Sequence, residues 1–240
     1  MYKLTALVKY QIHYYINSAK YLPPLVLFVL FVGINYQMGP FGIWSNLYIT
    51  AMALFVFSSW VAMTFAHCED KTQQHITAGH LQQEAMYYLS KTLSVLLLLV
   101  PFYLMLLLIP TVTGTFIRPI LASEMAVYLL VYFLTSLLGA SLGMIFNDSL
   151  MTKEFAQLAL LLVVCVAVVP FNIVYSHIPW VVTLYYLVPS INFLANRLDD
   201  LGDEAFLLDW HFLLFVLYMV GYSLVLTGVF VFAMPRGRRK

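Results

Sequence analysis

The chain has 240 residues, of which 62% are hydrophobic and 10% are charged, and its formal net charge is +1. Soluble domains carry about 25% charged residues, so this composition excludes an ordinary water-soluble domain and predicts an all-α integral membrane protein. The charge balance gives no reason to expect a nucleic acid as partner. The two cysteines, Cys68 and Cys165, lie far apart in the sequence, so no disulfide framework is expected.

The first twenty residues differ from the long apolar runs that follow them. Apolar side chains recur there at three- and four-residue spacing, whereas Lys9, His13 and Asn17 fall on another face. This pattern predicts an amphipathic interfacial helix over residues 1–20, at the cytoplasmic surface of the membrane. A frayed N-terminus that only orients the first span is the alternative. No compact apolar region with a small-residue cleavage site is found, so no cleavable signal peptide is expected.

Six apolar segments are candidate transmembrane helices, because a span needs about 20 mostly apolar residues. Pro23 and Pro24 suit the first turn of the first segment, and Pro101 predicts a kink in the third. Together the six segments form a single transmembrane domain, residues 1–240. The segments are 22–37, 47–66, 93–111, 125–146, 155–175 and 210–234.

Lysine and arginine residues indicate how the spans are oriented. With the N-terminus in the cytoplasm, ten basic residues lie inside, and only Arg118 and Arg197 lie outside. The opposite orientation inverts this ratio, so the positive-inside rule predicts a multi-pass protein with both termini in the cytoplasm. The ten inside residues are Lys3, Lys9, Lys20, Lys71, Lys91, Lys153, Arg236, Arg238, Arg239 and Lys240.

The first cytoplasmic loop, residues 67–91, is longer than a turn between two spans requires. Its charged residues keep it out of the bilayer, where each would cost about 3 kcal/mol at a helix centre. Polar and apolar side chains alternate along it, which predicts a short exposed helix suited to docking in the cleft of a partner protein. A helix that only anchors the loop at the membrane surface is the alternative. The predicted docking residues are Glu69, Asp70, Lys71, Gln73, Gln74, His75, Ile76 and Thr77.

The longest outer segment, residues 176–209, precedes the last span. Pro179 and Pro189 bracket an apolar run of about ten residues, which is too short to cross the membrane. We therefore expect a re-entrant helical hairpin over residues 179–194 that caps the outer end of the bundle, with an external loop resting on the membrane as the alternative. The exit-gate residues assigned to this hairpin are Trp180, Tyr185, Tyr186 and Asn192.

Several signatures of catalysis and ligand binding are absent from the sequence. No P-loop, H-E-x-x-H or C-x-x-C motif occurs, so the chain is not expected to be an enzyme. No metal is expected either, because the His and Cys residues near position 70 match no standard metal-site spacing. The six predicted spans contain no Asp, Glu, Lys or Arg, which argues against a proton-coupled transporter and a selective ion channel.

A run of small residues, 139–143, lies in the fourth predicted span. It contains G-x-x-x-G, a pattern that allows two helix backbones to approach closely. Packing within the chain is favoured over pairing between chains, because the pattern is common inside helical membrane bundles.

The chain resembles a small ABC-2-type transporter permease, the membrane subunit of an ATP-binding cassette exporter. The resemblance covers the interfacial helix, the six spans and the broken hairpin before the last span. In the first cytoplasmic loop, Glu69, residues 70–78 and Lys91 match the family's acidic residue, coupling helix and lysine before the third span. The chain departs from the family where it has HITAGHL in place of a frequent L-L-x-x-P.

The resemblance implies that the chain forms half of a translocation pathway together with a second permease copy, either identical or a sister chain. Two cytoplasmic ABC ATPase subunits would dock below and would bind ATP and magnesium, so the chain itself would bind no cofactor. The pathway between the two permease bundles would be lined by apolar and aromatic residues, and membrane lipids would surround the bundles. Such a pathway suits outward movement of an amphipathic or hydrophobic cargo, such as a peptide, an antibiotic or a lipid-like molecule. The expected location is a cell membrane, in particular a bacterial plasma membrane. A membrane scaffold or sensor subunit that is not coupled to ATP is the alternative.

Overall fold

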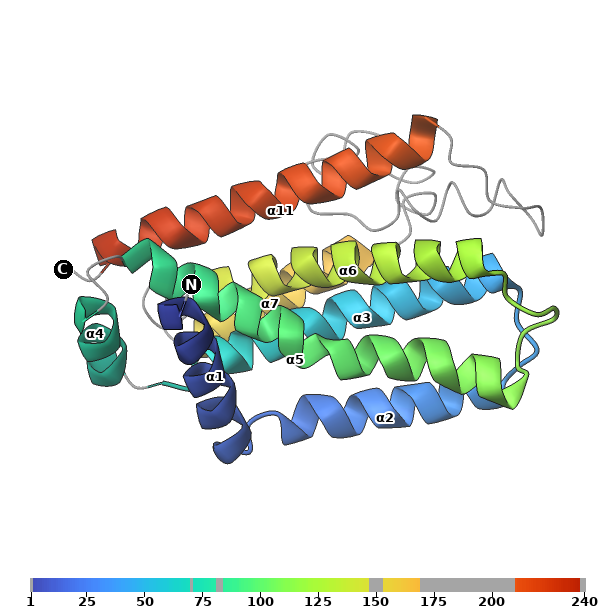
Figure 1. Cartoon of the computed structure of the whole chain (residues 1–240), viewed down its shortest axis with the longest axis horizontal. Coiled ribbons are helices and arrows are strands. Elements are labelled where there is room, and N and C mark those ends of the chain that lie inside the picture. Colours follow the sequence, from blue (N-terminus) through green and yellow to red (C-terminus); the bar gives the residue numbers. More distant parts are fainter. Residues whose placement is uncertain (1, 70, 81–83, 147–152, 169–209, 238–240) are drawn as a thin grey trace.

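The computed structural model describes residues 2–69, 71–80, 84–146, 153–168 and 210–237, and these residues form eight helices. They are α1 (Tyr2–Asn17), α2 (Leu22–Gln37), α3 (Ile43–Ala66), α4 (Lys71–His80), α5 (Glu84–Thr113), α6 (Ala122–Ile145), α7 (Lys153–Val168) and α11 (Trp210–Gly237). The long helices run side by side, and α1 crosses one end of them (Figure 1).

Four of the helices are long and apolar enough to cross a membrane: α3, α5 from Met86, α6 and the Phe212–Val231 part of α11. The bent pair of α1 and α2 is a candidate fifth span. The predicted count of six is therefore not confirmed for the described residues. α2 begins and ends where the sequence predicts, but its 16 residues cover only about 24 Å of an apolar core that is roughly 30 Å thick. α7, with its apolar stretch Glu154–Cys165, covers only part of the predicted span 155–175, because residues 169–175 lie outside the described part of the chain.

The axes of α1 and α2 meet at 80°. Ala19, between them, has a φ of 55°, which lies in the left-handed region and ends the first helix. Pro23 and Pro24 then begin α2, where their missing N–H groups leave no hydrogen bond unmade. The sequence-based expectation that residues 1–20 form a helix distinct from the first span agrees with this bend.

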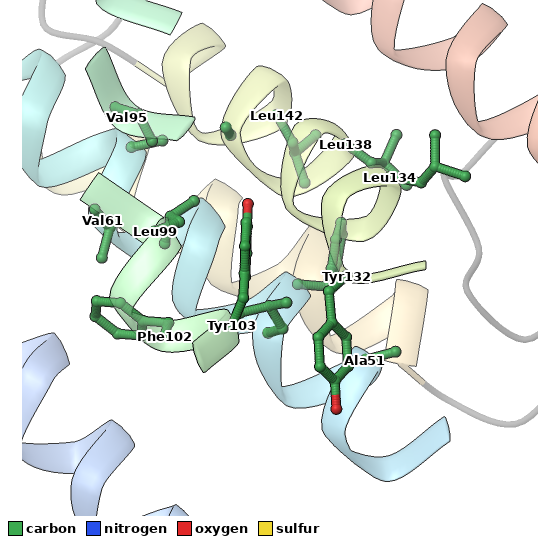
Figure 2. Close-up of a cluster of buried hydrophobic side chains, with 14 of the residues drawn as sticks. Ala51, Val61, Val95, Leu99, Phe102, Tyr103, Tyr132, Leu134, Leu138 and Leu142 are labelled. Atoms are coloured by element: carbon green, nitrogen blue, oxygen red, sulfur yellow. The ribbon is translucent and has the colours of Figure 1, made fainter. Parts of the chain in front are cut away.

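α3 and α6 make the most extensive contact in the bundle. A Cβ atom placed on Gly143 would lie 2.1 Å from the carbonyl oxygen of Ser59, and one on Gly139 would lie 2.0 Å from Ser58 Oγ. The small-residue run of α6 therefore lets α3 approach closely, which confirms packing within the chain. Apolar and aromatic side chains of α3, α5 and α6 fill the rest of the interior (Figure 2).

α5 continues through both Pro101 and Pro110. A proline has no N–H, so Pro110 leaves the carbonyl of Leu106 without its usual helical donor. The Tyr36 hydroxyl of α2 donates to this carbonyl at 2.8 Å. This bond satisfies a backbone group that would otherwise be unpaired in an apolar environment, and it joins α2 to α5.

The candidate spans do contain buried charged side chains, which corrects the prediction that they have none. Lys91 lies within the α5 span and Glu124 within the α6 span, and both are almost fully buried. The predicted segments began at residues 93 and 125, whereas α5 begins at Glu84 and α6 at Ala122, because a helix extends as far as its backbone hydrogen bonds form. Glu124 is paired with Arg118 at 2.6 Å, and Lys91 is paired with Glu69 at 3.0 Å.

Candidate functional site

The candidate functional site lies at the end of the bundle that carries α1, α4 and the first turns of α5, here named the polar end (Figure 1). The C-terminal end of α11 lies at the same end, whereas the connections 38–42 and 114–121 lie at the opposite end. Most of the basic residues predicted to be inside therefore gather at the polar end, and Arg118 is at the other. This separation agrees with the pattern of lysine and arginine in the sequence.

α1 packs along the first half of α5 through a face that is not purely apolar. Its Gln11 side chain is 2% exposed, and Gln11 Oε1 accepts hydrogen bonds from Ser90 Oγ at 3.2 Å and Ser94 Oγ at 3.0 Å. Ser90 and Ser94 are one turn apart on α5, so both point toward α1. The sequence-based assignment missed this contact, and the i, i+4 pair of serines was the available signal.

Glu69 and Lys91 form a buried ion pair beside this contact. Lys91 Nζ lies 3.0 Å from Glu69 Oε2, with the Lys91 side chain 1% exposed and the Glu69 side chain 4% exposed. The Tyr87 hydroxyl donates to the same carboxylate oxygen, and Lys91 Nζ lies 4.9 Å from the centre of the Tyr87 ring. A buried pair is strongly attracted in the low dielectric of the interior, but desolvation of both charges offsets most of the gain.

The short connection between α3 and α4 is held by contacts at each described residue, 67–69. The His67 carbonyl accepts a bond from Lys20 Nζ at 2.8 Å, and Cys68 Sγ lies 3.9 Å from the Tyr14 carbonyl oxygen. The Glu69 carbonyl accepts a bond from Gln74 Nε2 at 2.9 Å. Burial raises the pKa of the Cys68 thiol, which makes its reactive thiolate scarce at neutral pH.

α4 is a short helix between the second and third predicted spans, and it has an inner and an outer face. Gln74 is buried, whereas Ile76 is 57% exposed and Gln73 and Thr77 are half-buried. The Gln73 amide donates to the Tyr10 hydroxyl of α1 at 3.1 Å, which joins the two short helices. The structure thus separates the predicted docking residues into an inward group, Glu69 and Gln74, two half-buried residues, Gln73 and Thr77, and one outward residue, Ile76.

Other predicted site residues lie wholly or partly outside the described part of the structure. Asp70 is not described, and Lys71 and His75 are described only as backbone positions in α4. The re-entrant hairpin is also outside the described residues, as are its exit-gate residues Trp180, Tyr185, Tyr186 and Asn192.

Ser141 stands in a G-x-S-x-G pattern formed by the same small-residue run of α6. In hydrolases this pattern marks a serine on a sharp turn from a strand to a helix. Here the run lies inside an uninterrupted helix, and Ser141 Oγ bonds to the Leu137 carbonyl at 2.7 Å and to Thr227 Oγ1 at 3.0 Å. The motif therefore serves helix packing, and the Ser141–Thr227 bond joins α6 to α11.

Among the described residues, no group of three His, Cys, Asp or Glu side chains is arranged to hold a metal ion. Comparisons with protein-family models, curated proteins and solved structures return no match for the chain. The class that the structure does define is an all-helical protein, and its described residues include four to five helices long and apolar enough to cross a membrane.

Proposed function

We propose that the chain is the membrane-spanning subunit of an ATP-driven ABC exporter, and that ATPase subunits dock at its polar end. The observation that carries this proposal is the pairing of α4 with α1, through the bond from Gln73 to Tyr10, at one end of the bundle. A short polar helix with an exposed apolar residue, Ile76, offers a contact for a cleft in a partner. The ABC-2 resemblance names that partner as an ATPase.

In this proposal the chain supplies the pathway and its partners supply the energy. Two ATPase subunits bind ATP and magnesium, and a second permease copy completes the pathway. The interior of the described bundle is lined by apolar and aromatic side chains, which suits an amphipathic or hydrophobic cargo better than a small ion. A peptide, an antibiotic and a lipid-like molecule all have this character.

Replacing Ile76 with aspartate is expected to weaken ATPase docking at least about tenfold, which corresponds to about 1.4 kcal/mol. The substitution places a charge in an apolar contact that excludes water. The measurement is co-purification of the ATPase with the tagged chain in detergent, together with ATP hydrolysis by the purified complex. Ile117→Asp is the matched control, since Ile117 is 63% exposed at the opposite end of the bundle.

If the Ile76→Asp chain still captures the ATPase fully, α4 is not part of the docking surface. If the unsubstituted chain captures no ATPase, the chain is instead a membrane scaffold or sensor subunit. The two results are distinct because the first concerns a residue and the second concerns the partner itself.

The polar end is expected to face the cytoplasm. A chain with Cys165 replaced by alanine keeps only the buried Cys68, so a cysteine added at exposed Thr72 on α4 or at exposed Ile117 reports the side. A membrane-impermeant thiol reagent applied to intact cells should label position 117 and leave position 72 unlabelled until the membrane is opened. The chain without an added cysteine measures the residual reaction of Cys68. Labelling of position 72 from outside would reverse the proposed orientation.

A further inference from the structure

If α4 moves relative to the bundle, the connection between α3 and α4 must either bend or carry the motion onward. α3 ends at Ala66 and α4 begins at Lys71, so few residues separate two helices of different direction. A short connection of this kind ordinarily acts as a hinge, because it can absorb the motion of one element relative to the other. Here the described residues of the connection are each bonded to another part of the chain.

The three described residues of this connection make contacts with different parts of the chain. The carbonyl of His67 is bonded to Lys20, in the turn between α1 and α2, and Cys68 lies against the Tyr14 carbonyl of α1. Glu69 is paired with Lys91 and bonded to Tyr87, both on α5. The connection is therefore attached to α1 and to α5 at the same time.

The burial of two charged side chains, Glu69 and Lys91, needs a physical explanation. A buried ion pair gives little net stability compared with two apolar side chains of similar size, because both charges lose their hydration. What the pair adds is a constraint on distance and, through its hydrogen bonds, on direction, since two desolvated charges must stay in contact, whereas apolar contact is non-directional. Tyr87 strengthens this constraint by bonding to the same carboxylate oxygen.

We propose that Glu69, Tyr87 and Lys91 are positioning residues that hold residues 67–69, after the end of α3, rigidly against α5. A displacement of α4 is then passed to α1 and to the first turns of α5, because Gln74 of α4 bonds to the Glu69 carbonyl and Gln73 bonds to Tyr10 of α1. Gln11 extends the same unit, since its amide oxygen joins α1 to Ser90 and Ser94 of α5. The source of the displacement rests on the proposed function, but the rigidity does not.

This assignment changes the role of Glu69 within the predicted docking set. Its side chain is buried against α5, so it acts through the placement of α4 and not through contact with a partner. Contact with a partner falls to the outward residue Ile76 and to the exposed part of its half-buried neighbour Thr77. Docking and transmission are therefore carried by different residues, and different substitutions should separate them.

The first test uses the chain alone, in nanodiscs, and measures the distance between spin labels on α4 and α1 by pulsed electron paramagnetic resonance. The labels are placed at exposed positions, Thr72→Cys and Ala6→Cys, in the chain that carries Cys165→Ala. The unsubstituted pair should give one narrow distance distribution. Glu69→Gln should broaden or shift it, and Tyr87→Phe, which removes only the hydroxyl, should do so to a smaller degree.

Two further variants separate positioning from general loosening of the fold. Glu124→Gln breaks the ion pair between buried Glu124 and partly exposed Arg118 at the opposite end, and should leave the distance distribution unchanged. Reversing the pair with Glu69→Lys and Lys91→Glu should restore the narrow distribution, because the directional attraction returns. The proposal would be overturned if the Glu69→Gln chain gave a distance distribution with the same width and the same mean as the unsubstituted chain. It would also be overturned if Glu124→Gln broadened the distribution as much as Glu69→Gln does.

The second test adds the ATPase and distinguishes this inference from the proposed function. Glu69→Gln should capture the ATPase as well as the unsubstituted chain does, but should lose the dependence of cargo movement on ATP hydrolysis. Ile76→Asp should lose capture. If no ATPase binds any form of the chain, the proposed function fails while the distance measurement still decides the rigidity. Loss of capture in Glu69→Gln equal to that in Ile76→Asp would assign Glu69 to docking and overturn the separation.

Discussion

Replacement of Gly143 by alanine should destabilise the helix bundle by about 1–3 kcal/mol, as expected for an overpacked core. The added Cβ would lie 2.1 Å from the Ser59 carbonyl oxygen and 2.8 Å from the Ala62 Cβ. The nearest atom belongs to the backbone of α3, so it cannot move aside by a side-chain rotation, and the two helices must separate. Because α3 and α6 make the most extensive contact in the bundle, this separation reaches the core.

The matched controls for Gly143 are two glycines of α11. Neither Gly221 nor Gly228 has an atom within 4 Å of an added Cβ. Alanine at these positions should be neutral or should stabilise the helix by up to about 1 kcal/mol, because it restricts the unfolded backbone. Thermal unfolding in nanodiscs, followed by tryptophan fluorescence, measures all three variants. An unchanged melting temperature for Gly143→Ala would show that α3 and α6 do not approach as closely as described.

Replacement of Lys91 by methionine should cost about 3–5 kcal/mol, because it leaves the Glu69 carboxylate buried without its counter-charge. Methionine keeps much of the length of the lysine stem, so the loss measures the charge and not a cavity. The double variant Glu69→Leu with Lys91→Met should recover most of this loss, since an apolar pair needs no compensation. Chemical or thermal unfolding of the chain in detergent measures the three forms.

The pattern of the three stabilities is the decisive result. A double variant that is as unstable as Lys91→Met would mean that the pair itself stabilises the fold. A Lys91→Met variant as stable as the unsubstituted chain would mean that Glu69 reaches water, in contradiction to its burial beside Tyr87.

Much of the helical organisation was predictable from the sequence. Apolar runs of span length indicated α2, α3, α5, α6 and α11, because a backbone in lipid must satisfy its hydrogen bonds internally. The three- and four-residue spacing of residues 1–20 indicated α1, and alternating polar and apolar residues in the first loop indicated α4. These are local properties, since a helix bonds residue i to residue i−4.

The number of spans was not predictable to the same degree. The predicted span 155–175 lies partly outside the described residues, and within them α7 covers Lys153–Val168. The first segment was predicted at its correct bounds, yet its length leaves it a candidate span only together with α1. Composition reports where a segment is apolar, but length and bending decide whether it crosses a membrane.

The candidate site was predictable in location but not in the direction of its side chains. Local sequence patterns were enough to predict a helical membrane protein with a short polar helix in its first long loop, because hydrophobic periodicity and helical hydrogen bonding act between near neighbours. The inward turn of Glu69 to Lys91, the contact of Gln11 with two serines of α5 and the exposure of Ile76 were visible only once the helices were packed together. Those directions depend on where α5 packs against α1 and the end of α3, and such long-range packing leaves no periodic signal in the sequence.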